Sequence, residues 1–144
     1  PDATQGQFYS GVPLERVKEM AAGTSKKYRP IGNFYDFAAD FGNIRHEGGV
    51  AFNGGKKPTK MLRQFICYHQ RKDITVLDFF AGSASTGHAV LDQNAADGGQ
   101  RKFIMCTSNE ENICRDIAYK RLCNAMQGKE ASLDFYTVAW EDKE

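Results

Sequence analysis

The sequence predicts an α/β protein with a parallel sheet of about three strands and flanking helices. Apolar stretches with strand character end near residue 78, run over 101–107 and recur over 132–140. Segments whose apolar residues recur at helical spacing separate these stretches. Strands that alternate with helices are typical of parallel sheets joined by right-handed crossovers.

The helices are predicted from their start and stop signals. The first covers residues 14–22, between Pro13 and Gly23. The next begins at Pro58, a residue suited to the first helical position, and has apolar residues at 61, 62, 65 and 66. A third helix follows Gly87 and ends at Asp97-Gly98-Gly99, because glycine commonly terminates helices.

The most informative segment is Val76–Gly87, VLDFFAGSASTG. An apolar run ends on Asp78 and two aromatic residues, and small residues then lead into a helix. This order predicts a strand, a tight turn and a helix N-terminus, which is the layout of a nucleotide-type ligand site. An ordinary strand-to-helix turn without a ligand is the alternative.

The chemistry of this turn favours some ligands over others. Gly82, Ala84 and Gly87 nearly match the glycine fingerprint for dinucleotides, but the Asp78 carboxylate would repel a pyrophosphate. The phosphate-binding loop pattern fails because His88 follows the last glycine. A ligand with an adenosine, an ammonium group and no phosphate, such as S-adenosylmethionine, suits the acid better. A fragment of a dinucleotide-binding oxidoreductase remains the less favoured alternative.

Two further segments add candidate ligand groups. Asn109-Glu110 follows the second predicted strand, roughly 20 residues beyond the glycine turn, where a ribose-binding acid is expected. Its alternative role is a favourable negative charge at a helix start. Lys56 and Lys57 precede the helix at Pro58 and are candidates to neutralise a ligand carboxylate, unless they are only solvated charges.

Taken together, these segments resemble the cofactor half of amino-group DNA methyltransferases over residues 52–126. They are most similar to the modification subunits of type III restriction systems, which methylate adenine at N6. Lys57-Pro58, then 78–87, then Asn109-Glu110 occur in the family's order. The resemblance implies a partial Rossmann-like, S-adenosylmethionine-dependent methyltransferase fold. Ala84 departs from the family's second glycine and adds a methyl where we expect backbone to approach the ligand.

The resemblance also implies a domain division and a set of cofactor residues. Residues 1–47 are expected to be the tail of a target-recognition or connecting region, and residues 48–144 the cofactor-binding region. No metal site is expected. The expected S-adenosylmethionine-binding residues are Phe52, Asn53, Lys57, Asp78, Phe79, Phe80, Ala81, Gly82, Ser83, Thr86, Asn109 and Glu110.

The catalytic motif of this family is absent from the sequence. Amino-group methyltransferases hold a flipped base with an Asp/Asn-Pro-Pro-aromatic motif. The four prolines of this chain, at positions 1, 13, 30 and 58, are never adjacent. We therefore expect this chain to be the C-terminal piece of a longer methyltransferase. The longer protein would be catalytic, and this piece would be inactive by itself. The alternative is a non-catalytic cofactor-binding or interaction module.

Composition sets limits on partners and location. The 144 residues have one domain's length, and 19 basic residues against 18 acidic ones give too small a net charge to argue for nucleic acid alone. DNA is expected as a partner through the full-length protein, with a restriction subunit and a second copy as further candidates. Cys67 and Cys106 are expected to be reduced core thiols, which favours the cytoplasm. The sequence has no apolar run of membrane-spanning length.

Overall fold

The computed structural model describes residues 11, 13–24, 32–42 and 44–139, which fall into two units, Pro1–Tyr35 and Asp36–Glu144. The first unit contains α1 (Leu14–Ala21), which matches the predicted helix to within one residue. None of its residues is buried. Part of the predicted region 1–47 lies outside the described residues, and its boundary stays a prediction.

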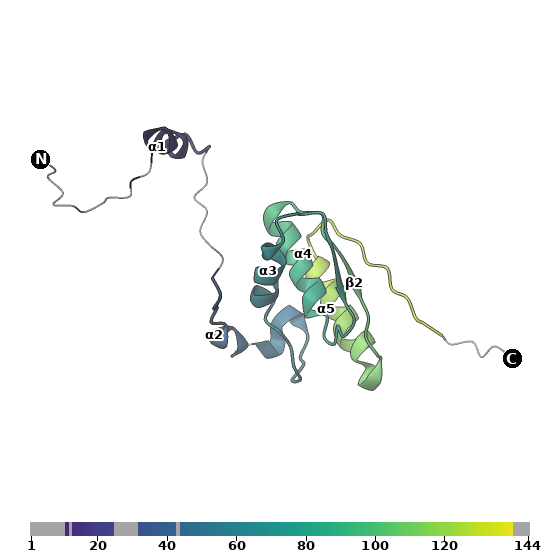
Figure 1. Ribbon diagram of the computed structural model, residues 1–144. Helices are drawn as coiled ribbons and strands as arrows, with labels where there is room; N and C mark the ends of the chain where they lie inside the picture. Colours follow the sequence, from purple (N-terminus) through teal and green to yellow (C-terminus); the bar gives the residue numbers. More distant parts are fainter. Residues whose placement is uncertain (1–10, 12, 25–31, 43, 140–144) are drawn as a thin grey trace, which may run out of the picture. The chain divides into compact units, whose positions relative to one another are not determined.

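The second unit holds the remaining elements (Figure 1). In chain order they are α2 (Ala38–Phe41), the 3-10 segment η1 (Ile44–Gly49), α3 (Thr59–Tyr68), β1 (Thr75–Asp78), α4 (Ser85–Asp97), β2 (Lys102–Met105), the 3-10 turn η2 (Glu110–Asn112), the π-helical η3 (Ile113–Tyr119) and α5 (Lys120–Met126).

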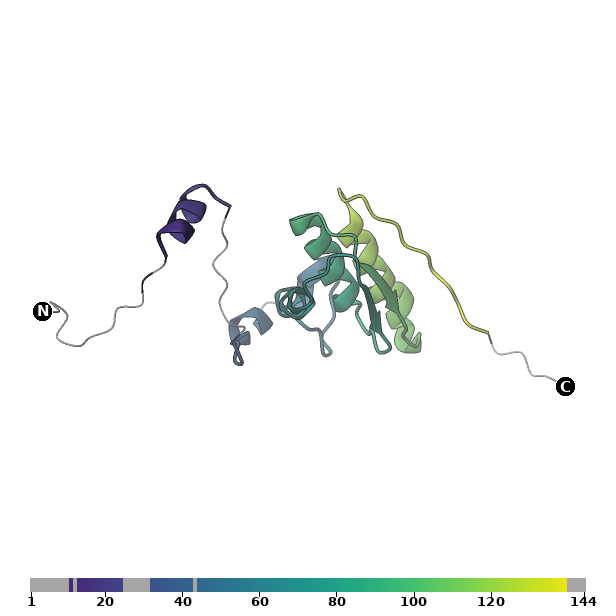
Figure 2. The same cartoon turned by 45° about the horizontal axis from the view of Figure 1, so that its top comes forward.

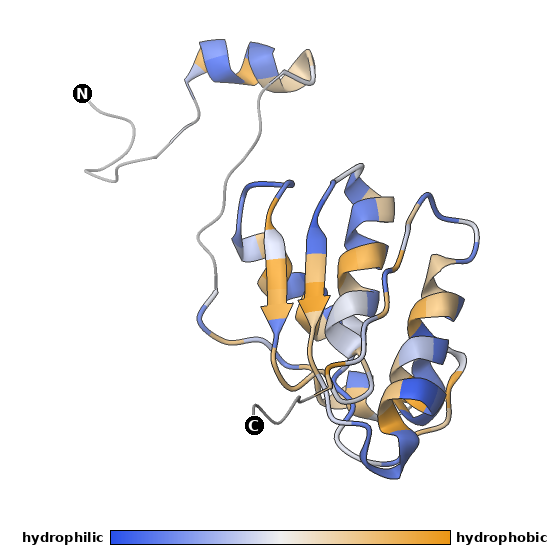
Figure 3. Ribbon diagram, turned by 90° about the vertical axis from the view of Figure 1, so that its right-hand side faces the viewer, coloured by the Kyte–Doolittle hydropathy of each residue, from blue (hydrophilic) through white to orange (hydrophobic). Residues whose placement is uncertain are grey.

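The two strands are parallel neighbours, and α4 is the crossover between them. Val76 pairs with Phe103 and Leu77 with Ile104 in the register of the sheet. Figure 3 shows the strands running side by side in one direction, with apolar residues along much of their length. Val76 and Phe103 pack against the core residues of α3 and α4, which include Val90. Alternate residues therefore face the helices, as expected for strands covered on one face.

On the opposite face of the sheet, the described part of the chain leaves apolar side chains half exposed. Leu77 and Ile104 are 50% and 54% exposed, respectively. Since these two residues lie opposite each other in the register, they form one apolar patch on the uncovered face.

The prediction of a third strand is wrong for the described part of the chain. Residues 132–139 have no strand pairing, and Trp140 lies outside the described residues. Leu133 packs against the core, and the Phe135 ring lies edge-on to Tyr119 with centroids 5.5 Å apart, but Val138 is 83% exposed. The segment after α5 thus continues the chain without regular secondary structure (Figure 2). Leu133 and Phe135 make side-chain contacts, while the backbone of the segment has no neighbouring strand among the described residues to bond.

Two smaller expectations are also corrected. Helix α3 begins at Thr59, and Pro58 is its N-cap, with an extended ψ of 131°. Cys67 and Cys106 are exposed thiols and not core residues. Cys67 lies on α3 and Cys106 just beyond β2, on sides that no described segment covers. Within the described ranges, no helix has the length and apolar character needed to cross a membrane.

Candidate functional site

The turn after β1 is held by the end of β2. The Cys106 N–H donates to the Asp78 carbonyl oxygen at 2.8 Å, and the Ala81 N–H donates to the Cys106 carbonyl oxygen at 3.0 Å. Gly82 then adopts a φ of 50°, a left-handed conformation that glycine allows without a steric cost. These contacts place the turn at the carboxyl ends of both strands, where open α/β sheets bind ligands.

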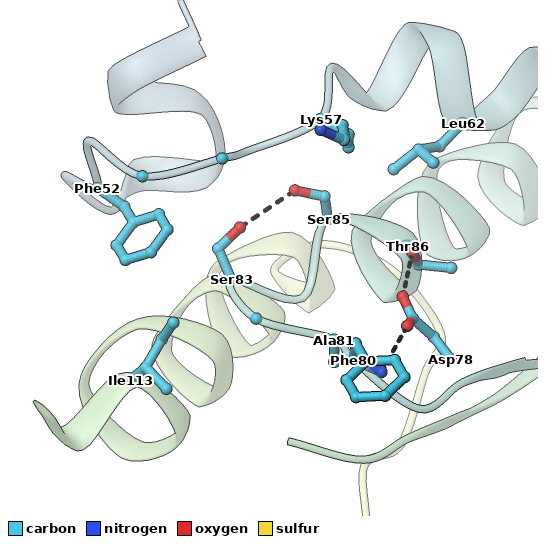
Figure 4. A pocket seen from close by; sticks show the side chains of 13 residues that line it. Phe52, Lys57, Leu62, Asp78, Phe80, Ala81, Ser83, Ser85, Thr86 and Ile113 are labelled. Carbon is cyan, nitrogen blue, oxygen red and sulfur yellow. Dashed lines mark hydrogen bonds between the residues drawn. The ribbon is translucent and has the colours of Figure 1, made fainter. Parts of the chain in front are cut away.

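The Asp78 carboxylate fixes the shape of this turn. One oxygen accepts the Phe80 N–H at 3.0 Å, and the other accepts the Thr86 hydroxyl at 2.7 Å. The carboxylate therefore joins the start of the turn to the first turn of α4, as Figure 4 shows. Because a charged acceptor makes strong hydrogen bonds, Asp78 stabilises the conformation of all the residues between.

Ala84 has its methyl group in the core. Its φ of 57° is left-handed, yet its exposed fraction is only 1%, and it packs in a cluster with Leu91 and Leu122. Ala84 does not line the pocket beside the turn. The expectation that this methyl lies where backbone approaches a ligand is therefore corrected.

We expect Ala84→Gly to leave ligand affinity unchanged and to shift the free energy of unfolding little. Glycine would relieve roughly 1–2 kcal/mol of left-handed strain. It would also remove a buried methyl worth about 0.8 kcal/mol. Chemical denaturation and ligand titration of this variant test both statements. Ala84→Val, which adds bulk to the same cluster, is the matched variant and should be clearly destabilised. A several-fold gain in affinity for Ala84→Gly would mean that the methyl obstructs the ligand.

A pocket of about 270 Å³ lies beside the turn, slightly below the lower end of the range for small-molecule sites. Figure 4 shows side chains from three segments around it. One wall is the stretch before and into α3, the second is the Asp78 turn with the start of α4, and the third is the start of η3. The lining residues are Phe52, Gly54, Gly55, Lys57, Leu62, Asp78, Phe80, Ala81, Gly82, Ser83, Ser85, Thr86 and Ile113.

The structure brings most of the predicted residues together. Eight of the expected positions line the pocket, namely Phe52, Lys57, Asp78, Phe80, Ala81, Gly82, Ser83 and Thr86. Asn53, Phe79, Asn109 and Glu110 are not among the lining residues. The Asn109 side chain instead accepts the Arg115 N–H at 3.3 Å. Ligand-binding roles for these four residues stay predictions.

Sequence reasoning missed Leu62, Ser85 and Ile113 as lining residues. The sequence predicts Leu62 only on the apolar face of its helix, although the side chain also reaches the pocket. Ser85 is the first residue of α4, so its position beside the glycine turn was a usable signal. Ile113 comes directly after the acidic turn Glu110–Asn112, and it is the residue that this region contributes to the pocket.

The two adjacent lysines have different roles. The Lys56 side chain is buried and donates to the carbonyl oxygens of Arg45, Glu47 and Val50, at 2.8, 3.1 and 2.5 Å. Burial lowers the pKa of Lys56, and the nearby positive charge of Arg121 lowers it further. Lys57 is exposed and lines the pocket. Lys57 is therefore the lysine available to a ligand, while Lys56 closes a loop.

The pocket combines three kinds of chemistry. Phe52, Phe80 and Ile113 offer apolar surface for a flat ring, and Figure 4 shows the Phe80 ring beside Ala81 at the turn. Ser83 and Ser85 make one wall polar, and their hydroxyl oxygens lie 3.2 Å apart. Lys57 supplies a positive charge and Asp78 a negative one. This set fits a ligand with an aromatic base, polar groups and a zwitterionic end.

Comparison with known proteins identifies similar sequences. The sequence profile of a family of N6/N4 methyltransferases, described as DNA methylase, matches residues 2–120. The StyLTI Mod subunit of a type III restriction-modification enzyme from Salmonella typhimurium is 50% identical over 120 residues, which are 80% of this chain and 18% of that protein. The type II methyltransferase M.KpnI from Klebsiella pneumoniae is 48% identical over 64 residues, 44% of this chain and 15% of that protein. The EcoPI Mod subunit of Escherichia phage P1 is 42% identical over 65 residues, 45% of this chain and 10% of that protein. The chain spans less than a fifth of the length of each relative.

Proposed function

The chain belongs to the DNA methylase family of N6/N4 methyltransferases, and we propose on this premise that it binds S-adenosylmethionine. The observation that carries the proposal is the pocket at the carboxyl ends of two parallel strands, with Asp78 on one wall and Lys57 on another. We further propose that the sheet is part of a Rossmann-like methyltransferase fold, which other segments of a longer protein would extend.

The lining residues suit the chemical groups of this cofactor. Phe52, Phe80 and Ile113 would contact the adenine ring, because aromatic and aliphatic surfaces bind flat rings well. Lys57 would neutralise the methionine carboxylate, and the negative charge of Asp78 would favour the ammonium group. Asn53, Phe79, Asn109 and Glu110 do not line the pocket in this structure, and we propose that they contact the cofactor only when it is bound. When bound, the cofactor supplies a methyl group activated by a positively charged sulfur.

The whole protein would be a site-specific DNA methyltransferase that modifies adenine at N6 as part of a restriction-modification system. DNA would be bound through the full-length protein, and a restriction subunit or a second copy would be its protein partner. In this proposal residues 48–144 bind the cofactor, and the catalytic Asp-Pro-Pro-Tyr-type motif comes from outside this chain. The proposed location is the cytoplasm.

The first test is titration of the chain with S-adenosylhomocysteine, the demethylated product, by calorimetry. Asp78→Ala should weaken binding by roughly 1–3 kcal/mol, because the Phe80 N–H and the Thr86 hydroxyl lose their shared acceptor. Unchanged affinity in this variant would remove Asp78 from the site. Tighter binding of NAD than of S-adenosylhomocysteine would favour a dinucleotide-binding protein instead.

Asp78→Asn is the matched control that separates shape from charge. The amide oxygen can accept the Phe80 N–H, and the Thr86 hydroxyl can rotate to accept from the amide nitrogen. If Asp78 acts only by holding the turn, this variant should bind nearly as well as the natural chain. If its charge attracts the ammonium group, Asp78→Asn should lose affinity as well.

A further inference from the structure

Arg121 of α5 is a fully buried cation that contacts the pocket from behind. Its side chain is 0% exposed. Its Nη1 donates to the Ser85 hydroxyl at 2.8 Å and to the Ser83 hydroxyl at 3.4 Å. Both serines line the pocket. The guanidinium thus holds the turn wall on the side opposite to any ligand.

The same guanidinium reaches the other wall through Glu47. Its Nη2 donates to one oxygen of the Glu47 carboxylate at 2.7 Å. The second oxygen of that carboxylate accepts the N–H and the hydroxyl of Thr59, at 3.1 and 2.9 Å. Thr59 is the first residue of α3, two positions after Lys57. Because Pro58 has no side chain that can cap the helix, Glu47 supplies the acceptor that the start of α3 needs.

Further contacts leave Arg121 little freedom to move. Its Nε donates to Nδ1 of His88 at 3.2 Å. Burial lowers the pKa of His88, which favours the neutral ring that accepts this bond. A methyl group at Gly48 would lie 2.7 Å from Cγ of Arg121, so the backbone of η1 packs directly on the arginine. An arrangement of several acceptors around one side chain suits the rigid, planar set of N–H donors of arginine and not the single ammonium group of lysine.

We propose that Arg121 and Glu47 are positioning residues that set the separation between the two walls of the cofactor pocket. The chain of contacts runs from Ser83 and Ser85 through Arg121 and Glu47 to Thr59, so it joins the Asp78 turn to the segment that presents Lys57. Neither side chain lines the pocket. Their effect on a ligand is exerted through the walls that they hold, and the ligand part of this proposal rests on the proposed function.

Glu47→Gln tests the proposal with almost no change in size. The amide can still accept from Thr59, but it then presents N–H groups to the N–H groups of Arg121, which breaks the connection. The expected result is a loss of affinity for S-adenosylhomocysteine of about tenfold or more. The reason is that the variant loses a charge-assisted hydrogen bond between the two residues that hold the pocket walls. Amide hydrogen exchange should also speed up in both walls, over residues 56–59 and 80–86. Arg121→Lys, which keeps the charge but offers fewer fixed donors, should show the same changes to a smaller extent.

Asp97→Asn is the matched control. Asp97 pairs with Arg101 at the far end of α4, and the side chains of this pair are 23% and 3% exposed, against 27% and 0% for Glu47 and Arg121. Its loss should lower stability without changing affinity or exchange in the two walls. Equal effects of Asp97→Asn and Glu47→Gln on affinity would overturn the proposal, as would unchanged wall exchange in Glu47→Gln. If the natural chain fails to bind S-adenosylhomocysteine, the proposed function falls, and the exchange comparison still decides whether the walls are coupled.

Discussion

Replacing Lys56 with Met is expected to lower the free energy of unfolding by about 3 kcal/mol, because three carbonyl oxygens lose one buried donor. The Lys56 ammonium donates to the carbonyl oxygens of Arg45, Glu47 and Val50, and these are its hydrogen-bond partners among the described residues. These carbonyl groups belong to η1 and the residue after it, the segment whose Glu47 carboxylate accepts hydrogen bonds from Thr59 at the start of α3. Chemical denaturation monitored by circular dichroism measures the loss.

Lys57→Met provides the matched control one position away. Lys57 is exposed and lines the pocket, so its loss should leave the unfolding curve unchanged and lower the affinity for S-adenosylhomocysteine. The two variants thus separate a structural lysine from a ligand-binding one. The opposite pattern, in which Lys56→Met is stable and Lys57→Met binds normally, would contradict both assignments.

These neighbours also mark the limit of what the sequence could predict. Two consecutive lysines before a helix have the same chemistry, and their order along the chain does not state which one points inward. Arg121 is a stronger example, because it follows Lys120 on a helix and looks like another surface charge. Its partner Glu47 lies 74 positions earlier in the chain. Only the packing of η1 on α5 brings the two together, and no local pattern contains that contact.

The turn itself could be predicted because its constraints are local. A carboxylate at a strand end, small residues and a helix start define the geometry within ten positions, and the structure places Asp78, Gly82 and Thr86 in one pocket. The family resemblance, based on the order of such segments, is confirmed by the match over residues 2–120. The strand over 132–140 could not be judged locally, because a strand requires a partner and the described residues offer none to it. The sequence could not place the Ala84 methyl group in the core, because its direction depends on a left-handed φ that alanine seldom adopts.

The isolated chain is expected to transfer no methyl groups to DNA, even with saturating S-adenosylmethionine. The adenine amino group is a poor nucleophile because its lone pair is delocalised into the ring. Transfer requires acceptors for the amino hydrogens and an aromatic side chain that holds the flipped base in line with the activated methyl. The pocket contains residues suited to the cofactor but no Pro-Pro turn that would aim such groups at one atom.

Tritium transfer from labelled S-adenosylmethionine to DNA of varied sequence measures this activity. The chain must first be shown to bind S-adenosylhomocysteine, so that inactivity reflects missing catalytic groups and not a missing cofactor. A longer protein that includes the Asp-Pro-Pro-Tyr-type motif should methylate adenine at N6, and Asp78→Ala in that protein should reduce the rate at low cofactor concentration more than at saturation. Such a difference is expected because Asp78 holds the turn beside the pocket proposed for the cofactor, so its loss should act on cofactor binding. Sustained incorporation by the isolated chain would instead place the catalytic groups within these 144 residues.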